Sequence, residues 1–356
     1  MTRVDVAIAG AGIIGLTTAL ELAAADCKVT VFDQSEAMSE ASRAAAGMLA
    51  GADPENPPEL KELAGLSLSL YPAFLDRVEQ LASKKVPIRT TRTVQGVHNI
   101  PAGARQLTES EMQALAPGAN REGFQFILLE EKSFDAWDLA EALPAAARAA
   151  GVELREHTPV LGVRRTGDGV EIVTAAATFS AGLFLNATGA WAPSLEPALA
   201  VRPRKGHMLT AELPGDMQMQ CVLRTPKVYI VPRGGSRYTV GSTVEDAGFD
   251  RTVEPLRIQE LFARAVQLWP PLRQGSVTET WIGFRPGSED NLPIIDRIGA
   301  NTWVATGHFK NGILLGPGTA RVLSRWMLGG EPGIDEPRID MSPFHCGRFA
   351  VAAAAS

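Results

Sequence analysis

The first 33 residues of the chain contain two apolar runs separated by a stretch of helix-forming residues. Val4–Ala9 is a short apolar run, residues 13–25 are rich in Ala and Leu, and residues 28–32 form a second apolar run before Asp33. A short continuous apolar run is typical of a buried parallel strand, and a longer run of Ala and Leu favours a helix. The pattern therefore predicts a strand–helix–strand unit.

Several later segments show helical signals. Residues 57–86 carry apolar side chains at three- and four-residue spacing, and residues 135–150 do so directly after Asp135, a favoured N-cap residue. Thr108 and Glu111 have the spacing of a capping box, which predicts the start of a short helix. Further helices are expected at residues 254–269 and near residues 319–328.

The remaining apolar segments predict strands of two kinds. From Val201 to Ile282 the chain has short alternating segments with β-branched and aromatic residues, which is typical of an antiparallel sheet. Other strands are expected at residues 88–99, 124–129, 152–154, 159–163, 171–173, 182–187 and 302–306. The order of these elements predicts an α/β fold in which a discontinuous cofactor domain is interrupted by an inserted antiparallel-sheet (α+β) domain.

The predicted cofactor domain comprises residues 1–86, 135–200 and 285–335, and the inserted domain comprises residues 87–134 and 201–284. Residues 336–356 are expected to form a C-terminal tail. The sequence contains no internal repeat and no low-complexity linker between these parts.

Composition narrows the functional classes. The chain is 45% hydrophobic and 21% charged with a net charge of −6, and no run is rich in Lys or Arg, so a nucleic-acid surface is not indicated. Cys27, Cys221 and Cys346 are widely spaced and form no C-x-x-C, which favours a reducing, cytoplasmic compartment. No uninterrupted apolar run reaches the roughly 18 residues of a membrane span. The histidines lack metal-ligand spacing, so no metal site is expected.

The strand–helix–strand unit carries a G-x-G-x-x-G motif at Gly10, Gly12 and Gly15. Gly10 would allow a tight turn, Gly12 a close approach of a pyrophosphate, and Gly15 close packing of the helix on the strand. Asp33 lies 18 residues after Gly15, where a carboxylate accepts hydrogen bonds from an adenosine ribose. The unit predicts a dinucleotide site and leaves NAD and FAD open. The alternative is a structural turn with nothing bound.

Further motifs occur along almost the whole chain. They are SRAAAGML from Ser42, EHTPVLGV from Glu156, VYIVPRG from Val228, GFRPGSEDNLPIID from Gly283 and ATGHFKNGILLGPG from Ala305. Together with the glycine motif they resemble the D-amino-acid oxidase superfamily of flavoproteins, and within it the glycine oxidases of bacterial thiamine biosynthesis. The resemblance implies non-covalent FAD in a discontinuous Rossmann-like domain, with an antiparallel sheet forming the substrate pocket over the flavin.

The resemblance also implies the FAD-binding positions. They are Gly10, Gly12, Ile13, Ile14 and Gly15 at the pyrophosphate turn; Asp33 and Gln34 at the ribose; Ala41, Ser42, Ala46, Gly47 and Met48 along the pyrophosphate and flavin; Val160 at the adenine; Gly189 at a strand end; and His308, Phe309, Lys310, Asn311, Gly312, Ile313 and Leu314 under the pyrimidine edge. N–H groups of Gly312 and Ile313 before a helix could stabilise negative charge on the flavin. Taken alone, the Ala-rich stretch also fits a short helix with Met48 and Leu49 in the core.

The resemblance assigns Arg285, Tyr229 and Lys310 as catalytic and substrate-binding residues, with Val244 and Met48 also at the substrate. A guanidinium can meet a carboxylate with two parallel hydrogen bonds and so orient the substrate. Alternatively, Arg285 pairs with Asp290 or Glu289, and Tyr229 is an ordinary sheet aromatic.

Lys310 stands where the glycine oxidases have a second arginine. A lysine ammonium lacks the two parallel N–H donors with which a guanidinium binds a carboxylate. Val244 replaces a bulkier residue, which suggests room for a somewhat larger substrate. His308 is an acid or base by type but a flavin neighbour by position.

The resemblance implies FAD-dependent oxidative deamination of a small amino acid, such as glycine, sarcosine or a small D-amino acid, by hydride transfer from Cα to flavin N5. The products would be an imine that hydrolyses to an oxo acid and ammonia, and hydrogen peroxide from O2. It also implies a homo-oligomer. The alternatives are a D-amino-acid, D-proline or sarcosine dehydrogenase with an acceptor other than O2, a flavin module acting on a modified tRNA uridine, and a flavin-binding protein without catalysis.

Overall fold

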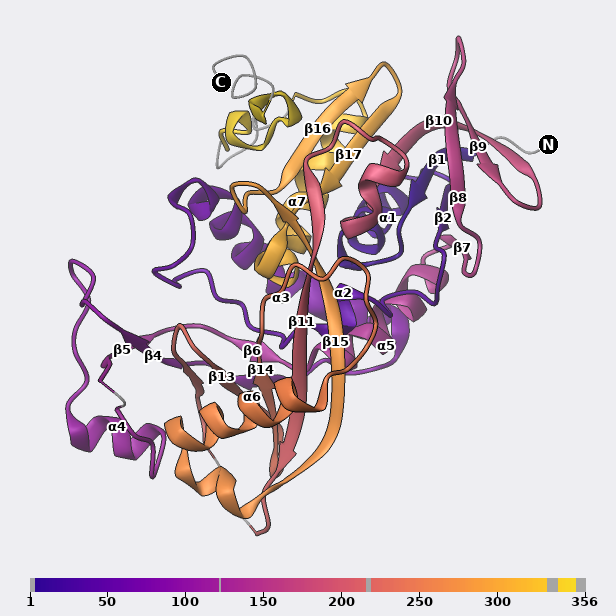
Figure 1. Cartoon of the computed structure of the whole chain (residues 1–356). Coiled ribbons are helices and arrows are strands. Elements are labelled where there is room, and N and C mark those ends of the chain that lie inside the picture. The colour runs from indigo at the N-terminus through magenta and orange to yellow at the C-terminus, as the bar shows by residue number, and fades with distance from the viewer. Residues whose placement is uncertain (1–3, 122, 216–218, 332–338, 350–356) are drawn as a thin grey trace.

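Two large β-sheets organise the chain (Figure 1). The computed structural model describes residues 4–121, 123–215, 219–331 and 339–349. Of the expected tail, residues 336–338 and 350–356 lie outside the described residues, while Ser342–Phe344 and Cys346–Phe349 form short 3-10 helices. Within the described ranges, no helix combines the length and apolarity that crossing a bilayer requires.

The first sheet has the order β16-β17-β10-β1-β2-β7, with β9 on β10 and β8 on β9. Its central pairs β17–β10, β10–β1, β1–β2 and β2–β7 are parallel, and β16, β9 and β8 pair antiparallel. The strands are β1 (Val4–Ala9), β2 (Val29–Phe32), β7 (Glu153–Arg155), β8 (Val160–Arg165), β9 (Val170–Thr174), β10 (Thr178–Asn186), β16 (Ile294–Gly299) and β17 (Thr302–Thr306).

Four helices cover one face of the first sheet. They are α1 (Ile13–Ala24), α3 (Lys61–Ala82), α5 (Ala136–Ala149) and α7 (Gly312–Met327). Val6 and Ile8 of β1 are buried in one apolar core with these helices, whereas Ala7 and Ala9 belong to a smaller core with β9 and β10. The alternation follows from the two-residue period of a strand and explains why β1 is apolar at nearly every position.

The second sheet has the order β15-β11-β14-β13-β12-β4-β5. All its pairs are antiparallel except β12–β4, which is parallel. The strands are β4 (Thr93–Val97), β5 (Gln125–Leu129), β11 (Val201–Glu212), β12 (Val222–Arg224), β13 (Tyr229–Gly234), β14 (Arg237–Gly241) and β15 (Ser276–Ser288). A separate two-stranded sheet joins β3 (Ile88–Thr90) and β6 (Ser133–Phe134).

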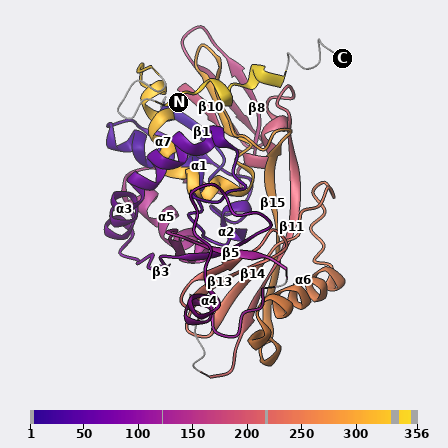
Figure 2. The same ribbon diagram turned by 90° about the vertical axis from the view of Figure 1, so that its left-hand side faces the viewer.

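The two faces of the second sheet have different neighbours. Helices α4 (Glu109–Leu115) and α6 (Pro255–Leu268) share an apolar core with one face. The short helix α2 (Ala41–Ala44) meets β15 on the other face, and Figure 2 shows α2 and α6 on opposite sides of β11 and β15. Further 3-10 turns are Pro58–Leu60, Gly189–Ser194, Pro270–Gln274 and Phe309–Asn311. The face toward α2 is therefore the one that can contribute to a site between the sheets.

Helix starts follow the capping signals in the sequence. The Thr108 side chain accepts from the Glu111 N–H at 3.3 Å while Glu111 accepts from the Thr108 N–H at 2.8 Å, so the predicted capping box is confirmed. Asp135 accepts from the Trp137 N–H at 3.0 Å and caps α5. The helix expected near residues 319–328 was wrong at its N-terminus, because α7 begins at Gly312 and continues through Pro317.

Helix α7 tolerates Pro317 because α3 supplies the missing polar partners. A proline has no N–H for the carbonyl four residues earlier, and here the Tyr71 hydroxyl donates to that carbonyl, Ile313 O. In the next step of the helix, the Gly318 N–H donates to Ser67 Oγ at 3.0 Å, and Ser67 Oγ donates to Leu314 O at 2.6 Å. These hydroxyls hold the first turn of α7 in place beside the site described below.

Replacing Ser67 with alanine should therefore destabilise the protein. Both Leu314 O and the Gly318 N–H would lose a buried partner, which costs about 1–3 kcal/mol of unfolding free energy. Ser69→Ala is the matched control, because Ser69 lies exposed on the same helix and its hydroxyl donates to Leu66 O in its own turn. Denaturant unfolding of the two variants measures the difference, and equal stabilities would contradict this account of α7.

Candidate active site

A cavity of about 560 Å³ lies between the carboxyl ends of the parallel strands and the α2-facing side of the second sheet. The glycine turn after β1, the turn after β10 and the start of α7 form one wall. Residues of β11, β13, β14 and β15 form the opposite wall. Crevices at the carboxyl ends of parallel strands are the usual ligand sites of such sheets, so the cavity is the candidate active site.

The glycine motif lies where the strand order changes direction. From β1 the chain passes through α1 to β2 on one side, while β10 lies on the other side, so the crevice opens between β1 and β10. Gly10 has φ +103°, and a Cβ there would be 2.3 Å from Ala187 O. A Cβ on Gly15 would be 1.9 Å from Gly10 O. Gly10 and Gly15 are therefore each required by a close approach of the backbone.

Asp33 lies beside this turn. Its carboxylate accepts from the Ala11 N–H at 2.6 Å and from the Ser35 N–H at 2.8 Å. Burial raises the pKa of the Asp33 carboxyl above its usual value, and these two backbone donors oppose the shift. Ser42 Oγ accepts from the Ile13 N–H at 3.0 Å, which ties α2 to the first turn of α1. The arrangement leaves a cradle of backbone and small side chains that fits the pyrophosphate and ribose of a dinucleotide.

Most residues expected at the cofactor line this one cavity. They are Gly10, Gly12, Ile13, Ile14, Asp33, Gln34, Ala41, Ser42, Ala46, Gly47, Met48, Val160, Gly189, His308, Phe309, Lys310, Asn311, Gly312 and Ile313. Gly15 and Leu314 are buried next to it without lining it. The alternative for the Ala-rich stretch also has a counterpart, because α2 is a short helix and Leu49 is in the core. Met48 lies between these two environments and lines the cavity.

Arg285 projects from β15 into the cavity across Gly206 of β11. Its Nη1 donates to Thr243 O at 3.1 Å, and its Nη2 donates to Ser242 Oγ at 2.7 Å. The ion pair considered for Asp290 does not form, because Asp290 bonds Arg348 at 2.7 and 3.0 Å. A guanidinium has five N–H donors, so the two bonds to the loop after β14 leave donors for a ligand.

Tyr229 reaches the same place from β13. It pairs with Gly241 of β14, and Gly241 pairs in turn with Met208 of β11. The Tyr229 hydroxyl lies 3.1 Å from Met208 Sδ and interacts with Ser242 and Arg285. Burial raises the pKa of the Tyr229 hydroxyl, and the neighbouring Arg285 charge opposes that shift. Tyr229 therefore remains a neutral donor beside the guanidinium.

Glycines without side chains make room for both groups, and the sequence analysis missed them. A Cβ on Gly206 would be 2.1 Å from Arg285 Nη1, and a Cβ on Gly241 would be 2.3 Å from the Tyr229 hydroxyl oxygen. A Cβ on Gly283 would be 2.5 Å from the Ala44 Cβ of α2. An isolated glycine inside a strand pattern signals such close approaches, and this signal could have found all three.

Lys310 lines the cavity with its charge already compensated. Its Nζ is 3.3 Å from Asp53 Oδ2 and 3.6 Å from Glu55 Oε2. Arg224, a further cavity residue on β12, lies 3.0 Å from Glu131 and 3.9 Å from Asp53. Unlike Lys310 and Arg224, Arg285 faces the cavity with neutral hydrogen-bond partners, which lie in the loop after β14.

Val244 and His308 lie at different depths of the cavity. Val244 is 49% exposed and lies at the rim. His308 is buried, with Nε2 3.2 Å from Thr319 Oγ1, and burial lowers the pKa of its imidazole to about 3. His308 is therefore neutral near pH 7. In the part of the chain that the structure describes, no group of three or more His, Cys, Asp or Glu side chains is arranged to hold a metal ion.

Replacing Gly206 with alanine should impair the site without unfolding the protein. The new Cβ would collide with the far end of a flexible side chain, Arg285, which can swing away at little cost to the fold. We expect kcat/KM for glycine, the substrate that the sequence resemblance implies, to fall about tenfold or more, while the melting temperature stays close to that of the parent. Gly162→Ala is the control, since a Cβ there meets nothing within 4 Å. An unchanged kcat/KM for Gly206→Ala would contradict the position of the guanidinium.

Comparison with known proteins decides the family. The model of the family described as FAD dependent oxidoreductase (DAO) matches residues 5–326. The chain belongs to this family. Its members use FAD, and the glycine cradle beside Asp33 fits that cofactor.

Two curated relatives of this DAO family protein illustrate its neighbours in sequence. Glycine oxidase of Geobacillus kaustophilus is 32% identical over 381 residues, covering 98% of this chain and 99% of the relative. The bifunctional protein ThiO/ThiG of Trichormus variabilis is 35% identical over 373 residues, covering 98% of this chain and 55% of the relative. The chain thus spans about half the length of the ThiO/ThiG relative.

A solved structure confirms the fold of this DAO family protein. The crystal structure of glycine oxidase from Geobacillus kaustophilus superposes with a TM-score of 0.90 at 29% sequence identity. The superposition covers 98% of this chain and 99% of the other. The predicted α/β fold class and the predicted FAD cofactor are therefore confirmed.

Proposed function

We propose that this protein catalyses the FAD-dependent oxidative deamination of a small α-amino acid, with glycine as the first candidate and O2 as the electron acceptor. The observation that carries the proposal is Arg285, whose guanidinium faces the cavity and is held by neutral partners. The glycine oxidase relatives support the choice of substrate. The same relatives give no support to the tRNA-modifying alternative.

The residues that would hold FAD follow from the cavity. Backbone of the Gly10–Gly12 turn and the first turn of α1 would bind the pyrophosphate, and Asp33 the ribose. Gly312 and Ile313 begin α7, so their N–H groups lack partners within the helix and could stabilise negative charge on the cofactor. When bound, FAD would accept two electrons from the substrate and pass them on to O2.

The chain's own contribution to catalysis would be orientation of the substrate. The free donors of Arg285 would take the substrate carboxylate in a bidentate contact, and the Tyr229 hydroxyl would donate to the same group. Fixing the carboxylate fixes the direction of the Cα–H bond. His308 is neutral and buried, so we assign it no proton transfer, and the amine would have to arrive deprotonated.

The compensated charge of Lys310 bears on substrate range. Since Asp53 and Glu55 pair with its ammonium, Lys310 would add little to carboxylate binding, and Arg285 with Tyr229 would carry it. Val244 lines the cavity with an exposed side chain where the family resemblance implies a bulkier residue, so sarcosine and a small D-amino acid are the second candidates.

The test is reduction of the purified holoenzyme without oxygen. Glycine, sarcosine, D-alanine and D-proline are added in turn, and bleaching of the flavin absorbance is followed, with peroxide measured after O2 is admitted. We expect bleaching by glycine and by at least one of the others, with peroxide formed in equal amount to substrate consumed. Absence of bleaching by all four would overturn the proposal, and bleaching without peroxide would replace O2 with another acceptor. Size-exclusion chromatography of the same sample tests the expected homo-oligomer.

A further inference from the structure

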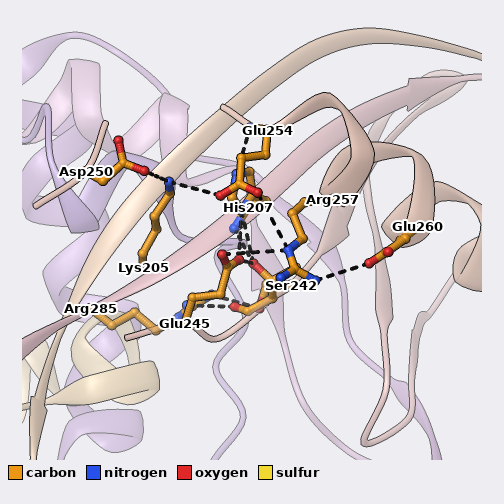
Figure 3. A network of polar contacts seen from close by, with 10 residues as sticks. Lys205, His207, Ser242, Glu245, Asp250, Glu254, Arg257, Glu260 and Arg285 are labelled. Atoms are coloured by element: carbon orange, nitrogen blue, oxygen red, sulfur yellow. Dashed lines mark hydrogen bonds and ion pairs between the residues drawn. The ribbon is translucent and has the colours of Figure 1, made fainter. Parts of the chain in front are cut away.

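The loop after β14 that holds Arg285 is itself anchored on the opposite face of the sheet. Gly206 faces the cavity beneath the guanidinium, and the next residue, His207, therefore points to the other face, toward α6. His207 is 0% exposed. Figure 3 shows it among Lys205, Glu245 and Glu254, with Arg285 reaching toward Ser242 close by.

The hydrogen bonds of His207 fix its tautomer. The Glu254 N–H at the start of α6 donates to Nε2 at 3.0 Å, so Nε2 carries a lone pair. Nδ1 therefore carries the proton, and it lies 2.9 Å from Glu245 Oε1 and 3.2 Å from Thr243 Oγ1. The imidazole thus links the start of α6 to the loop after β14.

Thr243 is the residue through which His207 reaches the cavity. The Thr243 hydroxyl accepts from the His207 backbone N–H at 2.8 Å and donates to Glu245 Oε1 at 2.5 Å. The carbonyl of the same residue accepts from Arg285 Nη1 at 3.1 Å. One residue therefore bonds the imidazole cluster with its side chain and the guanidinium with its backbone.

The rest of the loop is held by β11 as well. Lys205 and Glu245 exchange backbone hydrogen bonds at 3.0 and 2.8 Å. Lys205 is 0% exposed, and its Nζ lies 2.7 Å from Asp250 and 3.8 Å from Glu254. Arg257 of α6 lies 3.9 Å from Glu245. The loop is therefore fixed at several points. The contact of His207 with Glu245 and Thr243 lies next to Thr243 O, the atom that accepts the hydrogen bond from Arg285.

We propose that His207, acting through Glu245 and Thr243, is a positioning residue that aims the Arg285 guanidinium at the substrate carboxylate. The inference rests on the proposed carboxylate-binding function of Arg285. His207 is fully buried and does not line the cavity, so it would act on the substrate only through other residues. Loss of the Nδ1 donor frees the Thr243 backbone to shift. The N–H groups of the Arg285 guanidinium then meet a carboxylate at a poorer angle. The consequence is weaker binding of any carboxylate, with little change in the rate at saturation.

Two substitutions of His207 separate positioning from packing. His207→Asn keeps a side-chain donor near the Nδ1 position toward Glu245, and His207→Gln keeps an acceptor near the Nε2 position toward the Glu254 N–H. Thr243→Val removes the hydroxyl at the centre of the link and retains the shape of the side chain. Thr239→Val is its control, because Thr239 is a buried threonine of the preceding strand β14 and does not line the cavity.

The readouts are the Kd of the FAD-loaded protein for acetate, from the change in the flavin spectrum, the KM and kcat for glycine, and the melting temperature. Acetate has the carboxylate and lacks the amine, so it reports on the arginine alone. For His207→Gln and Thr243→Val we expect Kd and KM to rise about tenfold with kcat changed less than about twofold. His207→Asn should stay within about threefold of the parent in Kd while losing more thermal stability than His207→Gln.

Each outcome decides the question. If His207→Gln and Thr243→Val bind acetate like the parent, or if Kd follows melting temperature across all variants, the positioning role is wrong. If His207→Gln does not fold, Thr243→Val against Thr239→Val gives the same comparison. Failure of the parent protein to bind acetate or be reduced by any amino acid would overturn the proposed function instead, which distinguishes the two failures.

Discussion

Replacing Arg285 with alanine is expected to lower kcat/KM for glycine by about 30- to 1000-fold, because a charge-assisted bidentate contact contributes roughly 2–4 kcal/mol. Alanine removes the two side-chain hydrogen bonds from β15 to Ser242 and Thr243, as well as the proposed carboxylate contact. Arg285→Lys keeps the charge and loses the fork, so an intermediate loss is expected. Steady-state peroxide production measures both.

Arg202→Ala is the control for this change. Arg202 lies on β11 of the same sheet, with an exposed side chain 3.7 Å from Asp246, and an exposed pair of this kind contributes at most about 1 kcal/mol. Its kcat/KM should equal that of the parent. Retention of full kcat/KM by Arg285→Ala would mean that the substrate carboxylate binds elsewhere.

Replacing Gly10 with alanine is expected to yield protein without bound flavin. At φ +103° an alanine is strained, and its Cβ would meet a backbone oxygen, Ala187 O, at 2.3 Å. Unlike Arg285 at Gly206, a backbone carbonyl cannot swing aside, so the turn after β1 or β10 must move, and both line the cavity. The ratio of flavin absorbance to protein absorbance after purification measures the loss, and titration with FAD measures the remaining affinity.

Gly162→Ala again provides the comparison, since Gly162 lies in β8 with open space at its Cβ position. It should purify with a full complement of flavin. A yellow Gly10→Ala protein with the affinity of the parent would show that the turn can move without loss of the cofactor site, against the rigid fit described here.

Local signals in the sequence predicted local structure well. The strand–helix–strand unit, the capping box at Thr108 and the Asp135 cap depend on neighbours within a few residues, and each is present in the structure. The start of α7 could not be predicted in this way. Gly316, Pro317 and Gly318 all oppose a helix, and the hydroxyls that compensate for them come from α3, about 250 residues earlier.

The same distinction holds in the candidate site. Arg285 and Tyr229 belong to motifs that resemble a known family, and both line the cavity. Lys310, expected at the substrate, also lines the cavity, but its acidic partners Asp53 and Glu55 could not be predicted. They lie far away in sequence, and no periodicity or motif links them to Lys310. The role that we propose for His207 has the same origin, because only the fold brings the start of α6 to the back of β11.

The parallel pairing of β12 with β4 has a consequence for dissecting the protein. The chain enters the second sheet with β4 and β5, returns to the first sheet, and enters the second again with β11. A peptide of residues 201–288 made by itself would expose the β12 edge, and unpaired edges promote aggregation. Truncation therefore cannot isolate the substrate-binding half; two co-expressed fragments could regain activity only if the piece carrying β4 docks back onto its partner.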